Sequence, residues 1–103
     1  MAFATATDMP YFGAMGGQSR RGKVPASYGY KTEDTHATVD TAGYFNELST
    51  ILSVGDIIYV AVVTDRGAAA EAIATFGAHI VLSNVSGVVD VSDVTVFTVT
   101  DSD

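Results

Sequence analysis

Residues 41–63 constrain the fold most, because a helix-like apolar pattern there runs through a tight turn into the most apolar part of the chain. Five apolar side chains recur at i, i+1, i+4, i+7 and i+8, which places them on one stripe of an α-helix: Tyr44, Phe45, Leu48, Ile51 and Leu52. Asp40 or Thr41 can cap the start of this helix, and Gly55-Asp56 supplies the turn that ends it. The pattern predicts a short amphipathic helix that covers a sheet.

Residues 57–63, which follow this turn, predict the central strand of that sheet. Their apolar side chains occupy both alternating faces and most of them are β-branched, which favours a strand covered on both sides. We expect the apolar stripe of the helix to pack against four residues of this strand: Ile57, Tyr59, Val60 and Val62.

The remaining β-rich runs are short and are separated by turn residues. The alternation of Tyr28, Tyr30 and Thr32 predicts an earlier strand that resumes at 37–39, and later runs lie at 68–76, 79–83, 88–91 and 94–99. Residues 68–76 are ambiguous, because alanine favours a helix whereas their alternation favours a strand. The predicted fold class is therefore mainly β: a small antiparallel β-barrel or sandwich with one short amphipathic helix and an extended N-terminal arm.

Residues 1–26 read as that arm, and residues 27–103 as a single small β domain. The arm is rich in glycine and has no sustained periodicity. It nevertheless carries apolar side chains and three of the five basic residues of the chain, namely Met9, Tyr11, Phe12, Arg20, Arg21 and Lys23. This combination predicts ordering against a partner, so that deletion of the arm would remove attachment and leave the domain folded. The alternative is that the arm packs back over its own domain.

Length and charge exclude several classes of protein. A chain of 103 residues makes one domain, and 12 acidic against 5 basic residues argue against nucleic-acid binding, which depends on lysine and arginine. No apolar run reaches the roughly 20 residues of a membrane span, and the start does not resemble a signal peptide. We therefore expect a soluble protein made in a cytoplasm, with neither membrane nor nucleic acid as a partner.

No pattern in the sequence predicts catalysis, a metal site or a cofactor. The two histidines, His36 and His79, are not spaced as metal ligands, and a loop histidine near Asp34 and Asp40 is most often part of a solvated pair. Residues 16–19 lack the Gly-Lys-Ser or Gly-Lys-Thr ending of a phosphate-binding loop. We expect no enzyme, no catalytic residue, no metal and no cofactor.

A run of short motifs between residues 29 and 60 points to a known setting. Tyr-x-Thr-x-Asp at Tyr30–Asp34 is followed by Ala-Gly-Tyr-Phe-Asn at Ala42–Asn46 and by Gly-Asp at Gly55–Asp56 before the apolar strand. In these motifs the sequence resembles a group of small structural proteins of tailed bacteriophages.

The resemblance implies a capsid decoration or cement protein that binds the outer surface of an assembled head, with the major capsid protein as its partner. It also implies synthesis in the host cytoplasm and a homotrimer, because capsid lattices offer three-fold positions. On this interpretation the apolar and basic side chains of the arm contact the capsid. The alternative is a head-fibre or tail-associated module that binds a partner protein or a host glycan, for which Tyr11, Tyr28 and Tyr30 are the candidate aromatic platform.

Overall fold

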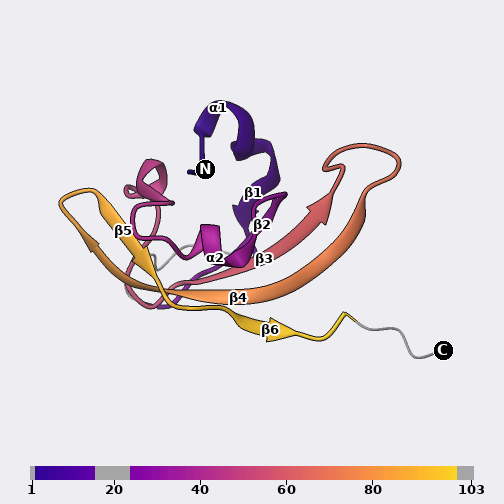
Figure 1. The fold of residues 1–103 in the computed structure, drawn as a ribbon. Coiled ribbons are helices and arrows are strands. Elements are labelled where there is room, and N and C mark those ends of the chain that lie inside the picture. Colours follow the sequence, from indigo (N-terminus) through magenta and orange to yellow (C-terminus); the bar gives the residue numbers. More distant parts are fainter. Residues whose placement is uncertain (1, 16–23, 100–103) are drawn as a thin grey trace.

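The computed structural model describes residues 2–15 and 24–99, and its main element is a curved six-stranded sheet (Figure 1). The strands are β1 (Phe12–Ala14), β2 (Ser27–Thr32), β3 (Ile57–Thr64), β4 (Ala72–Val85), β5 (Val88–Val91) and β6 (Thr95–Phe97). The helical segments are short: the α-helices α1 (Thr5–Asp8) and α2 (His36–Val39), and the 3-10 helices η1 (Met9–Tyr11) and η2 (Asn46–Leu48). The prediction of a mainly β protein is confirmed.

The sheet is mixed and open. Its strand order is β1-β2-β3-β4-β5, with β6 paired to β4, and β2 runs parallel to β3. The sequence prediction of an antiparallel barrel or sandwich is corrected here, because the long connection between β2 and β3 returns the chain to the end from which β2 started. This connection contains α2, so the predicted strand at 37–39 is helical. Within the described residues, no helix is long and apolar enough to cross a membrane.

Two hairpins complete the sheet. In β4 the predicted runs at 68–76 and 79–83 merge into one strand that starts at Ala72 and has 14 residues. The turn before it uses positive φ angles at Asp65 and Gly67. The second hairpin joins β4 to β5 through Ser86 and Gly87, whose φ angles of 54° and 82° match the two-residue turn that suits the twist of a hairpin.

Residues 41–52 do not form the predicted amphipathic α-helix. They make successive turns and the 3-10 helix η2, because Gly43 takes a φ of 89° that no α-helix accommodates and its N–H donates to Val89 O of β5. The predicted burial is nevertheless confirmed. Tyr44, Phe45, Leu48 and Leu52 are all buried, and Ile51 packs partly buried against them.

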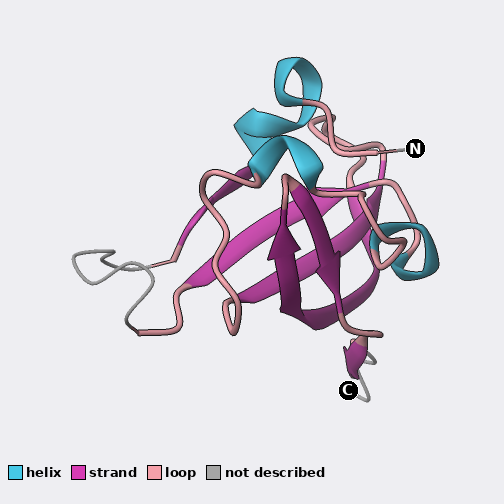
Figure 2. Ribbon diagram, turned by 90° about the vertical axis from the view of Figure 1, so that its left-hand side faces the viewer, coloured by secondary structure: helices cyan, strands magenta, loops and turns pink. Residues whose placement is uncertain are grey.

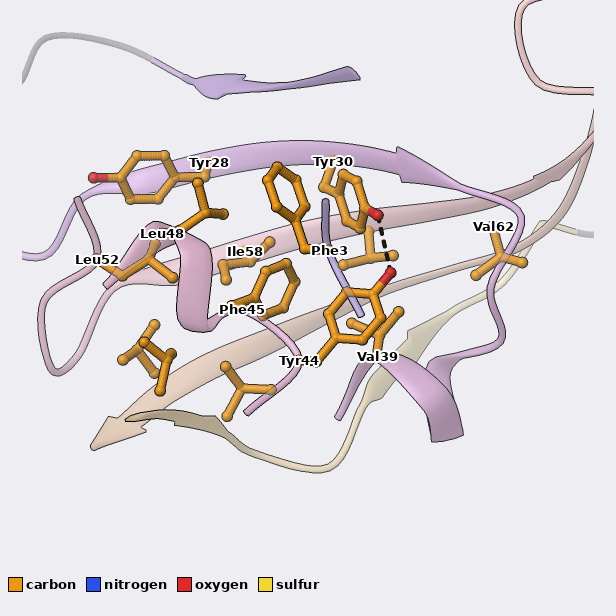
Figure 3. Packing of buried hydrophobic residues seen from close by; sticks show 14 residues of the cluster. Phe3, Tyr28, Tyr30, Val39, Tyr44, Phe45, Leu48, Leu52, Ile58 and Val62 are labelled. Atoms are coloured by element: carbon orange, nitrogen blue, oxygen red, sulfur yellow. Dashed lines mark hydrogen bonds between the residues drawn. The ribbon is translucent and has the colours of Figure 1, made fainter. Parts of the chain in front are cut away.

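One face of the sheet carries the hydrophobic core (Figure 3). Side chains of the strands meet those of the covering turns in one cluster: Phe3, Tyr28, Tyr30, Val39, Tyr44, Phe45, Leu48, Leu52, Ile58, Val60, Val62, Val81, Val89 and Val91. The prediction for Val60 and Val62 is confirmed. Ile57 and Tyr59 alternate with these inward residues and lie on the opposite face, so their predicted contact with the covering segment is wrong.

Residues 2–15 belong to this domain. Phe3 is 1% exposed, donates its backbone N–H to Tyr44 O at 3.0 Å, and lies with its ring centroid 5.3 Å from that of Tyr30. Asp8 forms a buried ion pair with Arg66 at 2.9 Å. For residues 2–15 the predicted extended arm is therefore corrected in favour of the alternative, in which the segment packs over its own domain.

Truncation of Leu48 tests the packing of the turns on the sheet. Leu48 is fully buried in the cluster, so Leu48→Ala should lower the free energy of unfolding by about 2 to 5 kcal/mol, the usual cost of a lost leucine side chain and its residual cavity. Chemical denaturation measures the change. The exposed Val54 gives a control, since Val54→Ala should shift the value by less than about 0.5 kcal/mol. An equally small loss for Leu48→Ala would contradict the packing.

Candidate docking face

The side of the sheet opposite the core is the candidate functional surface. Paired residues of neighbouring strands point to the same side, and the register pairs Ile57 with Ile80, Tyr59 with Ala78, and Ala61 with Phe76. Phe76 is in turn paired with Phe97 of β6. We call this surface the outer face and define it by Ile57, Tyr59, Ala61, Phe76, Ala78, Ile80 and Phe97.

Three aromatic rings form the centre of the outer face. Tyr59 and Phe76 stack with centroids 6.3 Å apart and an interplanar angle of 11°. Phe97 meets both rings edge-on, at 6.2 Å from Tyr59 and 5.3 Å from Phe76. Stacked and edge-to-face pairs are the favourable aromatic geometries, so each ring is held in place by the other two.

The outer face has no cover among the described elements. Figure 1 shows the helical segments on the other side of β3 and β4, and in Figure 2 the helical ribbons lie above the strands and at their right. Ile80 remains 45% exposed and Phe97 43%. A contiguous exposed apolar surface on a small protein is a mark of an interaction site.

One end of the outer face is hollowed. The hollow has a volume of about 300 Å³ and is lined by Tyr11, Met15, Gly29, Tyr30, Lys31, Tyr59, Ala61 and Phe76. Gly29 leaves room there for the Met15 side chain, because a Cβ atom on it would lie 3.3 Å from Met15 Sδ. Lys31 lies at the rim, where it forms an ion pair with Glu71 at 3.0 Å. The rest of the lining is mostly apolar.

Of the sequence-predicted contact residues that the structure describes, Tyr11 lines the hollow at the end of the outer face, whereas Met9 and Phe12 lie elsewhere. Met9 and Phe12 pack against the core, and Phe12 stacks on Tyr28 with centroids 5.3 Å apart. Tyr11 carries the Arg66 guanidinium 4.1 Å above its ring centroid. The apolar surfaces of these three side chains were predicted to meet a partner, but they are used in contacts within the chain. Arg20, Arg21 and Lys23 lie outside the described residues.

Two further predictions are corrected by burial. Tyr28 and Tyr30 lie in the core, so they cannot form the aromatic platform considered for a glycan. His36 and His79 are also buried, and they contact each other, although His36 was predicted to be a solvated loop residue. The contact was missed because its two members are 43 positions apart in the chain.

A buried chain of hydroxyl groups ties the covering segment to the sheet (Figure 3). Tyr44 Oη donates to Asp34 Oδ2 at 2.7 Å and lies 2.9 Å from Tyr30 Oη, which must then be the donor of that second bond. Burial is the main cause that raises the pKa of both tyrosines above the usual 10, so both stay protonated. This chain joins residues of the two motifs at 30–34 and 42–46.

The residues of the outer face were missed by site analysis of the sequence, although a signal existed. Residues 57–63 are apolar on both alternating faces, which predicts that something covers the second face as well. Within residues 2–15 and 24–99, the fold covers only one of these faces. The sequence patterns predict Tyr59 to be a core residue and do not identify Phe76, Ile80 or Phe97 as candidate contact residues.

Comparison of the chain with protein-family models, with curated proteins and with solved structures found no match. What the geometry offers chemically is a rigid surface of aromatic and aliphatic groups with one ion pair at its rim. Aromatic side chains and a low density of charge are the composition of a protein–protein interface core.

Proposed function

We propose that this protein is a structural virion protein that binds the outer surface of an assembled phage capsid through its outer face and stabilises the capsid. The observation that carries the proposal is the uncovered apolar outer face with its cluster of Tyr59, Phe76 and Phe97. The role is that of a decoration or cement protein. It is structural and not enzymatic, and it uses no cofactor.

The shape and chemistry of the outer face support attachment to a protein. The strands hold the three rings in fixed positions, so little side-chain entropy is lost when a partner covers them. Removing apolar area from water contributes about 25 cal/mol per Å². Aromatic anchors near the middle of such a surface typically supply most of the binding energy, while the Lys31–Glu71 pair lies at the rim, where a charged pair costs little.

The capsid is the proposed occupant for two reasons. The motifs at 30–34 and 42–46 resemble those of phage structural proteins, and their residues form the hydroxyl chain that holds the covering turns on the sheet. A lattice of identical subunits also lets a contact of modest strength act many times over. Arg20, Arg21 and Lys23, which follow Met15 in the sequence, remain the predicted charged contacts to acidic groups of the major capsid protein.

The proposal includes a homotrimer located on the capsid exterior after synthesis in the host cytoplasm. Three-fold positions of a capsid lattice match a closed three-fold oligomer, in which each copy presents the same surface to the same site. Analytical ultracentrifugation of the purified protein tests this part. A species that remains monomeric in solution and on the particle would contradict it.

Co-sedimentation with purified heads that lack the protein tests the attachment. We expect saturable binding with a copy number comparable to that of the major capsid protein, and no further uptake by heads that already carry the protein. Failure to sediment with heads would contradict the proposal. Saturation at only a few copies per particle would also contradict it and would favour a head-fibre or tail-associated module.

A further inference from the structure

Two histidines form a buried pair away from the outer face. His36, the first residue of α2, is 9% exposed, and His79 of β4 is 0% exposed. His36 Nδ1 lies 3.2 Å from His79 Nε2, and His79 Nδ1 lies 3.0 Å from Ser92 O. The pair therefore connects α2, β4 and the segment that joins β5 to β6.

The hydrogen-bond chemistry assigns both tautomers. A carbonyl oxygen can only accept, so His79 Nδ1–H donates to Ser92 O, and the neutral ring then has a bare Nε2. His36 Nδ1–H must donate to that nitrogen. His36 Nε2 is left as a bare nitrogen, and it is buried with no hydrogen-bond partner in the structure.

If either histidine takes up a proton in this arrangement, the new N–H has no hydrogen-bond acceptor to point at. A proton on His79 Nε2 would point at His36 Nδ1–H and would force His36 into its other tautomer, with hydrogen on Nε2. A proton taken up directly by His36 also goes to Nε2. In both cases an N–H is buried without a partner at His36 Nε2, and a positive charge is buried on one of the two rings, so protonation carries the cost of desolvating both.

The groups around His36 oppose its protonation on balance. Burial is the main cause that lowers the pKa of His36, and His79 on β4 lowers it further, while Asp40 at the end of α2 acts in the opposite direction. The remaining neighbour on β4 is uncharged Gly77, on which a Cβ atom would lie 3.3 Å from His36 Cε1. The segment after β5 faces the pair with the Ser92 carbonyl.

The same contacts fix residues 92–94, which lead into β6. His79 binds Ser92 O, and Ser92 Oγ accepts the Ile80 N–H at 2.9 Å. The Val94 side chain then fills the space over Gly77, where a Cβ atom would overlap it. These contacts support the antiparallel pairing of β6 with β4, which places Phe97 in the aromatic cluster of the outer face.

We propose that His36 and His79 form an acid-sensitive latch, whose protonation releases the 92–94 segment and β6 and so removes Phe97 from the outer face. The latch rests on the contacts and burial of the pair and does not depend on the proposed function. Its consequence for binding, which is weaker attachment in acid, rests on the proposed function.

The direction of the effect follows from proton linkage. A histidine in an opened or unfolded chain has a pKa of about 6.5, whereas that of His36 in the closed form is lower. Below pH ~6.5 the open form therefore holds a proton that the closed form lacks. The equilibrium constant for opening should rise by up to about tenfold per pH unit until the closed form also takes up the proton, and the latch should keep its full stability at higher pH.

Hydrogen exchange of the β6 amides between pH 7.5 and 5.0 tests the latch. The chain has only two histidines, and carboxylates titrate mainly near pH 4, so this window isolates the pair. After correction for the intrinsic pH dependence of exchange, the protection of the β6 amides should fall by up to about tenfold per pH unit. As the pH is lowered, this loss should begin at a higher pH in β6 than in β3. Unchanged protection in β6 across this range would overturn the proposal.

His36→Asn serves as the matched variant. An asparagine amide can donate to His79 Nε2 as His36 does, cannot take up a proton, and can turn its oxygen towards a protonated His79. We expect β6 protection close to that of the wild type at pH 7.5 and a shallower loss in acid; a loss as steep as in the wild type would contradict the latch. Should the variant fail to fold, NMR titration of His36 Cε1–H in the wild type decides. A midpoint below 6.5 supports the latch, and one at or above 6.5 overturns it.

Discussion

Replacing Phe3 by alanine is expected to lower the free energy of unfolding by about 3 to 5 kcal/mol, the range for a buried phenylalanine. The Phe3 ring is 1% exposed and lies among those of Phe12, Tyr30 and Phe45 with centroid distances of 5.6, 5.3 and 6.1 Å. Its removal leaves a cavity that these rings can fill only in part. Denaturant titration followed by circular dichroism measures the change.

The control for this substitution comes from the same N-terminal segment. Met15 is 56% exposed, and Met15→Ala should change the stability by less than about 0.5 kcal/mol. If Phe3→Ala were equally mild, residues 2–15 would not belong to the core. For the same reason, deletion of residues 1–26 should unfold the domain, so it cannot serve as a clean test of attachment.

The sequence predicted burial better than it predicted backbone conformation. The spacing of Tyr44, Phe45, Leu48 and Leu52 marks side chains that turn to one side, and all four are buried. Successive 3-10 turns satisfy nearly the same spacing as an α-helix over two or three turns. The positive φ of Gly43 decides between the two, and a glycine in the sequence does not reveal its φ.

The choice of inner and outer face could not be predicted. All seven residues from 57 to 63 are apolar. A shift of the strand pairing by one residue would therefore exchange the two faces without changing the apolar pattern of either face. Ile58, Val60 and Val62 face the core because β2, paired in register with β3, buries Tyr28 and Tyr30 on the same side. The two strands are parallel and are joined by a long connection, so local sequence patterns do not predict that they pair.

Contacts between distant parts of the chain explain the other differences. Phe3 lies in an aperiodic glycine-rich segment, so nothing local indicates that it fills the core. Asp8 meets Arg66, and His36 meets His79, through contacts between residues far apart in the sequence. Local sequence patterns assign such residues to solvent, because a charged or polar side chain without a near neighbour is usually exposed.

Substituting Ile80 by aspartate should abolish attachment while leaving the fold intact. Ile80 lies on the outer face opposite Ile57 and is 45% exposed, so the free protein can accept a carboxylate at this position. In a covered interface the same carboxylate would be buried among apolar groups without a partner. A cost of about 3 kcal/mol or more corresponds to binding weakened by roughly a hundredfold or more.

Val54→Asp is the matched control for this substitution. Val54 is 66% exposed and lies in the turn before β3, outside the sheet. Both variants replace an exposed β-branched residue with aspartate and add one negative charge, so general repulsion from the capsid affects them equally. Thermal unfolding of both variants tests whether the fold is kept.

The outer face is the surface that we propose meets the partner. The most direct measurement is the binding isotherm of the wild type, Ile80→Asp and Val54→Asp on purified heads that lack the protein. We expect Val54→Asp to bind like the wild type and Ile80→Asp to bind at least about a hundredfold more weakly. Binding of folded Ile80→Asp at wild-type strength would show that the outer face does not meet the capsid.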